Sequence, residues 1–150
     1  MNRVTISKAA GLAGVGVETI RFYERRRLIE RPPKPMDSGF RDYPIETIRR
    51  IRFIRQAQDL GFSLKEINEL LSLQADPSAV CADVRARAQT KLEDIDQKIT
   101  QLGAIRSALQ GLISACPGRG PAARCCSILE ALETHEREGA PAQRCQETEP

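Results

Sequence analysis

The fold of the first part of the chain is decided by the stretch Ser7-Lys-Ala-Ala-Gly-Leu-Ala-Gly-Val-Gly-Val-Glu-Thr-Ile-Arg-Phe-Tyr-Glu24. Small apolar residues recur at helical spacing as far as Ala13, two glycines interrupt the pattern, and Val17 restarts it. Ser7 is placed to cap the first helix. Two short helices joined by a glycine turn predict a helix-turn-helix, the motif that lays its second helix in the major groove of DNA.

The second helix and the segment after it supply candidate DNA contacts. A helix beginning at Val17 buries Ile20 and leaves Thr19, Arg21 and Tyr23 to face the groove or the adjacent phosphates. A segment rich in proline and glycine then separates Leu28-Ile29 from Phe40-Arg-Asp-Tyr43. This arrangement predicts two short strands around a wing. Three further side chains are expected to anchor the DNA backbone: Arg41, Tyr43 and Arg55.

The distribution of charge along the chain also favours DNA as the partner. The net charge is only +3, but basic residues exceed acidic ones before residue 60 and acidic residues exceed basic ones after it. A basic front segment suits phosphate. A solvated arginine face would carry the same charge, so the helix-turn-helix pattern, more than the charge, supports the DNA prediction.

Three more helices follow the wing. Pro44 suits the first turn of a helix with apolar positions from Ile48 to Ala57, which Gly61 ends. Ser63 and Glu66 have the spacing of a capping box and predict the next helix. After a break at residues 76–78, apolar residues alternate at three- and four-residue steps over about five heptads, with Arg106 in one slot. They are Val84, Ala88, Leu92, Ile95, Ile99, Leu102, Leu109 and Ile113.

This narrow apolar stripe on one long helix has nothing local to pack against. A partner helix, and therefore a homodimer, is expected. Cys116-Pro117 ends the helix, and a loop leads to a short helix from Ser127 to Glu133. The residues beyond have a composition typical of a disordered tail, and we expect Cys145 there to be incidental.

The cysteines are the second candidate site. No run of residues approaches a membrane span and no export signal is evident, so we expect a cytoplasmic protein with reduced thiols. Cys81 and Cys116 bound the long helix and lie about 50 Å apart within one chain, given the helical rise. Two antiparallel helices would place Cys81 of one subunit beside Cys116 and the Cys125-Cys126 pair of the other. The alternative for Cys81 is a small buried apolar side chain, the commoner role of a lone cysteine.

A site of thiolates selects soft ions. Mercury(II), cadmium(II) and lead(II) suit such ligands better than magnesium, calcium or manganese. A tetrahedral structural zinc site requires a fourth ligand, and the presence of both Cys125 and Cys126 leaves zinc(II) open.

Three motifs together resemble the MerR family of metal-responsive transcription regulators. They are Val17-Glu-Thr-Ile-Arg-Phe-Tyr-Glu24, Gly39-Phe-Arg-Asp-Tyr43 and Gln58-Asp-Leu-Gly-Phe-Ser-Leu-Lys-Glu66. The resemblance implies a mainly α fold. Its parts would be a winged helix-turn-helix domain over residues 1–75, an antiparallel dimerisation helix over 78–116, and a metal-binding loop with a short helix over 117–134, followed by a tail over 135–150.

The cysteine spacing most resembles that of the mercury-responsive members. Their three metal cysteines match Cys81, Cys116 and Cys125, at steps of 35 and 9 residues. In zinc-responsive relatives the ligand cysteine begins the final helix, which favours Cys126 as the third ligand instead. Those relatives also use a second cysteine and a loop histidine, where this chain has Pro117 and Pro121. Copper(I)-responsive members lack a cysteine at the position of Cys81, so its presence favours a divalent ion.

The resemblance implies a non-enzymatic activator and repressor of a mercury resistance operon. Metal binding would bend and untwist promoter DNA so that RNA polymerase can use it. One alternative is the same scaffold responding to lead, cadmium or zinc. Another is an iron-sulfur redox sensor. Such a sensor requires four clustered cysteines, whereas the loop together with Cys116 has three. A thiol metal chaperone or oxidoreductase would leave the helix-turn-helix and wing unexplained, and the chain has no CxxC.

Overall fold

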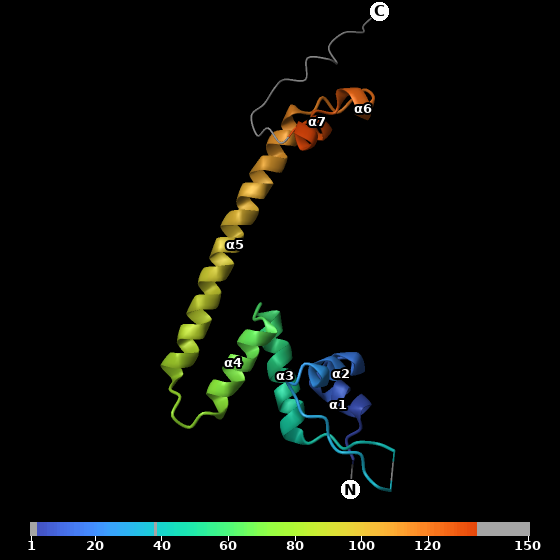
Figure 1. The fold of residues 1–150 in the computed structure, drawn as a ribbon, viewed down its shortest axis with the longest axis vertical. Coiled ribbons are helices and arrows are strands. Elements are labelled where there is room, and N and C mark those ends of the chain that lie inside the picture. Colours follow the sequence, from blue (N-terminus) through green and yellow to red (C-terminus); the bar gives the residue numbers. More distant parts are fainter. Residues whose placement is uncertain (1–2, 38, 135–150) are drawn as a thin grey trace, which may run out of the picture. The chain divides into compact units, whose positions relative to one another are not determined.

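The fold is mainly helical. A computed structural model describes residues 3–37 and 39–134 (Figure 1). The chain divides into two compact units, Met1–Lys91 and Leu92–Pro150. Within the described residues the helices are, in order, α1 (Ile6–Ala13), α2 (Val17–Arg25), α3 (Ile45–Asp59), α4 (Leu64–Ala75), α5 (Cys81–Ala115), α6 (Ala122–Cys125) and α7 (Ser127–Thr134).

The predicted helix-turn-helix is confirmed in α1 and α2. The Thr5 hydroxyl accepts a hydrogen bond from the Lys8 amide and caps α1, so the predicted cap at Ser7 is wrong by two residues. Gly14 ends α1 with a φ of +70°, a conformation that costs glycine little. The Gly14 and Gly16 turn then directs the chain into α2.

One apolar core holds the N-terminal unit together. α1 packs against both α2 and α3, and α3 packs against α4. The side chains of Ile20, Tyr23 and Leu28 are completely enclosed, as are those of Ile51 and Ile54 from α3. Removing this much apolar surface from water is the main force that fixes α2 on the lobe.

The wing differs from the prediction. Residues 28–29 and 40–43 form no strand, and none occurs anywhere in residues 3–37 and 39–134. The three prolines of this segment have no amide proton to donate to a strand ladder. The backbone of Tyr43 instead donates to the Val4 carbonyl at 2.9 Å, while the Val4 amide donates to the Asp42 carboxylate at 2.8 Å.

A left-handed residue ends α2. Arg27 has a φ of +57°. Its amide donates to Glu24, and the Leu28 amide donates to Tyr23, both at 3.0 Å. This is a Schellman motif, in which the left-handed position is usually a glycine. An arginine there adopts the turn at a conformational cost.

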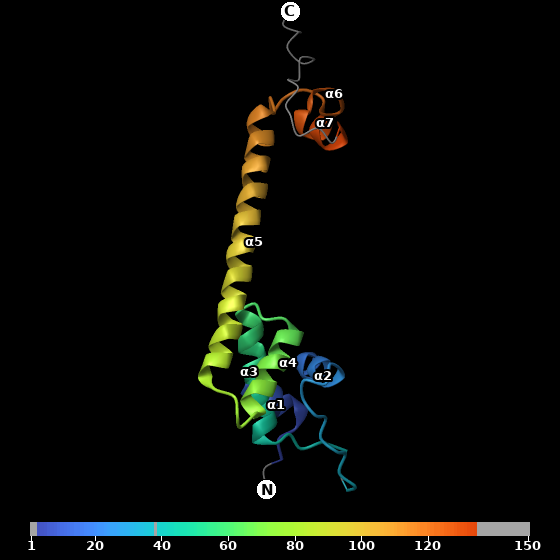
Figure 2. The same cartoon turned by 60° about the vertical axis from the view of Figure 1, so that its left-hand side comes forward.

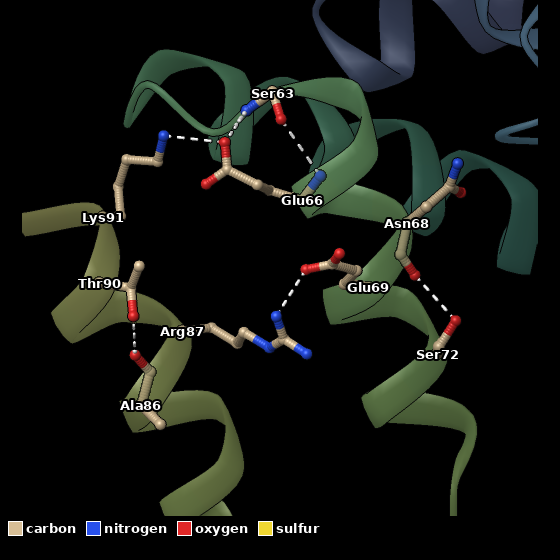
Figure 3. Close-up of polar contacts among 9 residues, drawn as sticks. All are labelled: Ser63, Glu66, Asn68, Glu69, Ser72, Ala86, Arg87, Thr90 and Lys91. Carbon is tan, nitrogen blue, oxygen red and sulfur yellow. Dashed lines mark hydrogen bonds and ion pairs between the residues drawn. The ribbon is translucent and has the colours of Figure 1, made fainter. Parts of the chain in front are cut away.

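The capping box at α4 is confirmed. Ser63 accepts from the Glu66 amide, and the Glu66 carboxylate accepts from the Ser63 amide (Figure 3). These two hydrogen bonds therefore fix where α4 begins and where the Glu66 side chain lies.

The long helix is also confirmed. α5 runs for 35 residues without a break in both views (Figures 1 and 2). Residues 81–91 of α5 belong to the N-terminal unit, and the following residues belong to the second unit. Large apolar side chains of the predicted stripe are exposed, for example Ile99, Leu102 and Ile113. A single chain thus leaves the stripe without a partner.

Beyond α5 the chain makes a glycine turn and two short helices. α6 lies within the segment expected to be a loop, and α7 matches the predicted final helix. The predicted disordered tail, with His135 and Cys145, lies outside the described residues. Among the described residues, no helix is long and apolar enough to span a membrane.

Candidate DNA-binding surface and cysteine positions

The exposed face of α2 carries cationic side chains. Arg21 is about half exposed, and its Nη1 lies 2.7 Å from Glu18 Oε1. Arg25 is exposed one turn further on, whereas Thr19 is half-buried. The pair with Glu18 is open to solvent and therefore weak, so a phosphate can compete for Arg21.

A cavity of about 180 Å³ brings the α2 face and the wing segment together. Arg21, Arg31 and Arg41 line it, along with Glu24 and Tyr43. Arg41 donates to the Pro32 carbonyl at 3.1 Å, which directs its guanidinium. Two of the predicted DNA-contacting arginines thus lie around one concave surface, and guanidinium groups suit phosphate oxygens.

Tyr43, which was predicted to anchor the DNA backbone, lines this cavity but is buried. The residue is only 3% exposed, and its hydroxyl donates to Glu24 Oε1 at 2.6 Å. Burial and the bond to Glu24 raise the pKa of Tyr43 to about 12. Glu24 Oε2 also lies 3.6 Å from Arg31 Nε. Tyr43 therefore holds Glu24, which in turn places Arg31.

Tyr23 is also in the core, so the prediction that it faces the groove is corrected as well. Its side chain is fully buried, and its hydroxyl donates to Gln58 Oε1 at 2.6 Å. Burial raises the pKa of Tyr23, which Arg55 lowers in part. Helical spacing explains the difference, because Tyr23 lies three residues after Ile20 and shares its inward face. Arg55 itself is half exposed and pairs with Asp59 at 3.3 Å.

Arg31 was not among the predicted contacts, and two other arginines of the basic front segment are structural. Arg50 Nε donates to the Leu28 carbonyl at 2.7 Å, and Arg52 Nε donates to the Leu12 carbonyl at 2.9 Å. The first acceptor lies in the turn after α2, and the second lies in the last turn of α1. Charge alone does not separate such arginines from those that face a phosphate. Arg31 could have been found only from its position between the second helix and the wing.

The cysteines lie at the ends of α5 and around α6. Cys81 is exposed at the first residue of α5, and Cys116 is half-buried directly after its last residue. Cys126, between α6 and α7, is a free half-buried thiol. Cys125 is disulfide-bonded and is not among the free cysteines. The structure therefore gives the two adjacent cysteines different states.

The loop before α6 closes tightly on Cys125. Gly120 has a φ of +89°, and a side chain there would come within 3.0 Å of the Cys125 sulfur. Next to Cys126, the Ser127 hydroxyl is buried and has no hydrogen-bond partner among the described residues. The hydroxyl could donate to a thiolate of Cys126, and thiolates are the ligands that soft cations prefer.

One chain does not bring three ligands together. In residues 3–37 and 39–134, no three side chains of histidine, cysteine, aspartate or glutamate are grouped to hold a metal ion. Cys81 and Cys116 are separated by the whole of α5. A site that contains both therefore requires a second chain.

Two family models match the chain. The family model described as "MerR HTH family regulatory protein" matches residues 4–74, and the model "MerR, DNA binding" matches residues 48–112. The two matches overlap on α3 and α4 and together include most of α5.

Individual relatives span nearly the whole chain. The mercuric resistance operon regulatory protein of Serratia marcescens is 40% identical over 142 residues, which are 95% of this chain and 96% of that protein. The HTH-type transcriptional regulator ZntR of Escherichia coli K12 is 39% identical over 129 residues, 85% of this chain and 91% of ZntR.

A solved structure has the same fold. The transcription regulator PbrR691 of Ralstonia metallidurans CH34, in complex with lead(II), matches with a TM-score of 0.71 at 32% identity. The match covers 88% of this chain and 99% of PbrR691. The chain therefore belongs to the MerR family of metal-responsive transcriptional regulators, which bind promoter DNA and are not enzymes.

Proposed function

We propose that this protein is a cytoplasmic homodimer that represses and activates a mercury resistance operon in response to mercury(II). The supporting comparison is the Serratia marcescens regulator, named for mercuric resistance and similar over nearly the full length of both chains. The supporting chemistry is a set of cysteine thiols, which bind mercury(II) more strongly than harder ions.

The observation that carries the proposal is the position of the thiols relative to the unpartnered stripe on α5. The stripe runs along a helix bounded by Cys81 and Cys116, and its apolar side chains, such as Leu102 and Leu109, are exposed. An antiparallel partner helix would bury them and bring Cys81 of one subunit to Cys116 of the other. Two equivalent sites per dimer follow.

The third ligand comes from the Cys125-Cys126 pair. The step of 9 residues from Cys116 favours Cys125. The free thiol of Cys126, with the unsatisfied Ser127 hydroxyl beside it, favours Cys126 in the conformation described here. A disulfide sulfur is a poor ligand because the metal binds the thiolate, so Cys125 could serve only after reduction.

Promoter DNA would lie against the arginine-lined face of the N-terminal unit. Arg21 and Arg41 border one cavity and would bind phosphates. Thr19 on α2 and Arg55 on α3 would supply further contacts. Tyr23 and Tyr43 would act from the core by holding α2 and Glu24 in place. Metal binding would favour the arrangement of the two DNA-binding lobes that bends and untwists the promoter, and RNA polymerase would then initiate.

The competing proposal is the same regulator responding to lead(II), cadmium(II) or zinc(II). PbrR691 was crystallised with lead(II), which makes lead a specific alternative. A transcription assay on the cognate promoter, in a thiol-buffered series of ions, separates the candidates. We expect mercury(II) to induce at the lowest free concentration, and a lower threshold for lead or zinc would reassign the ion.

The same assay identifies the third ligand. Cys125→Ser and Cys126→Ser are matched variants at adjacent positions, and the one that loses more of the mercury response carries the ligand. Cys116→Ser is the reference for complete loss of a ligand. If Cys116→Ser responds normally, the thiol site itself is wrong.

A further inference from the structure

Polar side chains join the start of α5 to α4. Lys91 Nζ lies 2.8 Å from Glu66 Oε1, and Arg87 Nη1 lies 2.7 Å from Glu69 Oε2 (Figure 3). Lys91 and Arg87 are one turn apart on α5, and both reach towards the same side of α4. These pairs lie within the N-terminal unit.

The Glu24 side chain is equally enclosed, but as a whole residue only Lys91 is buried among the charged residues that the structure describes. The Lys91 side chain is 9% exposed, and Nζ lies 5.7 Å from the centre of the Phe62 ring. A buried ammonium is costly unless a partner neutralises it. Arg87, at 52%, is open to solvent, so its pair with Glu69 contributes much less.

The partner of Lys91 is held in place before the pair forms. Glu66 is fixed by the capping box with Ser63 at the start of α4. The bond from Lys91, with those from Ser63, lowers the pKa of Glu66 to about 2. The position of Lys91 is therefore tied to the first turn of α4 through a carboxylate that has little freedom.

Apolar packing does not provide the same attachment. A cavity of about 380 Å³ opens beside the ion pair, between α3, α4 and the start of α5. Its apolar lining includes Phe53, Leu60, Phe62, Leu70, Val84 and Ala88. Residues 81–90 are all exposed. Lys91 is thus the buried contact that holds this end of α5.

We propose that Lys91 is a positioning residue that fastens the start of α5 to the DNA-binding lobe and transmits metal binding at Cys81 to that lobe. This inference rests on the proposed function, because it takes Cys81 as a metal ligand. Cys81 and Lys91 lie on the same helical segment of the N-terminal unit. A displacement of Cys81 on metal binding can reach the DNA-binding lobe only if this segment of α5 and the lobe move together.

Lys91→Met is the variant that separates this role from folding. Methionine keeps an apolar side chain against Phe62 and removes the buried charge. Removal of one partner of a buried pair lowers stability, so every variant is assayed below its melting temperature. Glu66 is left with its two Ser63 bonds and partial exposure to water. Lys98→Met is the matched control, because Lys98 is exposed on the same helix and forms no ion pair with a described residue. Lys91→Arg keeps the charge.

Three quantities are measured on each full-length variant: operator affinity by gel shift, mercury(II) bound per chain, and transcription with and without mercury(II). We expect Lys91→Met to bind operator and metal within about threefold of the parent, because the substitution changes neither a proposed DNA contact nor a proposed metal ligand. Its induction ratio should fall at least fivefold. Lys98→Met should induce normally, and Lys91→Arg should recover most of the ratio.

Two results would overturn the proposal. In one, Lys91→Met induces as well as the parent protein. In the other, operator affinity falls by the same factor as induction, which would give Lys91 a structural role only. If the parent protein itself bound mercury(II) without changing transcription, the proposed function would fail, and with it the transmission role.

A double-mutant cycle tests the contact independently of metal and DNA. The melting temperatures of Lys91→Met, Glu66→Gln and the double variant are compared with the parent. A loss in the double variant smaller than the sum of the single losses confirms the coupling. Additive losses would show that the pair does not hold α5, and would overturn the proposal even if the protein proved to be a mercury sensor.

Discussion

The hydroxyl of Tyr43 donates a 2.6 Å hydrogen bond to Glu24, across 19 residues of sequence. The Glu24 carboxylate is only 9% exposed and also lies near Arg31. The chain uses this buried bond to connect the wing segment to α2, where the sequence suggested a strand pair. The position of the arginine-lined cavity depends on it.

Tyr43→Phe should therefore weaken both stability and DNA binding. The variant keeps the ring but leaves a nearly buried carboxylate oxygen without its donor, which typically costs about 1–3 kcal/mol. Urea unfolding measures the first effect and gel-shift titration the second. Unchanged values in both would show that the Tyr43–Glu24 bond does not organise the wing.

Arg21→Ala should weaken operator binding without dissociating the dimer. Arg21 is an exposed cation on α2 and borders the proposed phosphate cavity, far in sequence from the α5 stripe. The logarithm of affinity should also depend less steeply on salt, by a slope of about 1, if one phosphate contact is lost. Lys98→Ala on α5 is the control. Unchanged operator affinity in Arg21→Ala would refute the assignment of this face.

Arg27→Gly should stabilise the protein. Arg27 occupies the left-handed position of the turn after α2, at a φ of +57°. Glycine adopts this conformation without the steric cost, so the free energy of unfolding should rise by about 1 kcal/mol. Chemical denaturation compares the variant with the parent. A less stable glycine variant would mean that the Arg27 side chain contributes more than the strain removes.

The stability of the N-terminal unit should fall in acid because of Glu66. Its pKa in the folded protein is about 2, below the ordinary value of 4.5. The unfolded chain therefore takes up a proton first, so the stabilisation is complete above pH 4.5 and is lost as the pH falls to about 2. Thermal unfolding at pH 5, 3 and 2 tests this against Glu66→Gln, which keeps an acceptor for Ser63. The difference in melting temperature between the parent and Glu66→Gln should become smaller as the pH falls. A difference that stays constant would exclude the ion pair as its source.

Elements with local signals could be predicted from the sequence. The capping box at Ser63 and the long apolar repeat of α5 depend on neighbouring residues, and both were predicted correctly. The cap of α1 was misplaced because Thr5 and Ser7 are both good caps, and the local pattern does not separate them. The prediction of two wing strands was wrong because the prolines have no amide protons to donate. The carbonyl of Val4, which is distant in sequence, instead accepts the hydrogen bond from the Tyr43 amide.

The candidate site was predictable only in outline. The predicted contacts Arg21 and Arg41 lie around one cavity, whereas Tyr23 and Tyr43 are amphipathic side chains that can face a groove or fill a core. Only the tertiary contacts with Gln58 and Glu24 determine which of these two roles each tyrosine has. The buried Lys91 had no sequence signal either, because it depends on Glu66, which lies 25 residues earlier in a different helix.

The most direct test of the central claim is a mercury(II) titration of a heterodimer made from Cys81→Ser and Cys116→Ser chains. A site shared between subunits would remain intact once, from Cys81 of the second chain and Cys116 of the first, while the other site would lack both thiols. Each homodimer would have two sites that lack one thiol apiece. The doubly tagged dimer is purified after mixing and refolding. The account predicts one tightly bound ion per heterodimer and none for either homodimer, whereas no tight binding in all three would contradict a mercury site shared across the antiparallel helices.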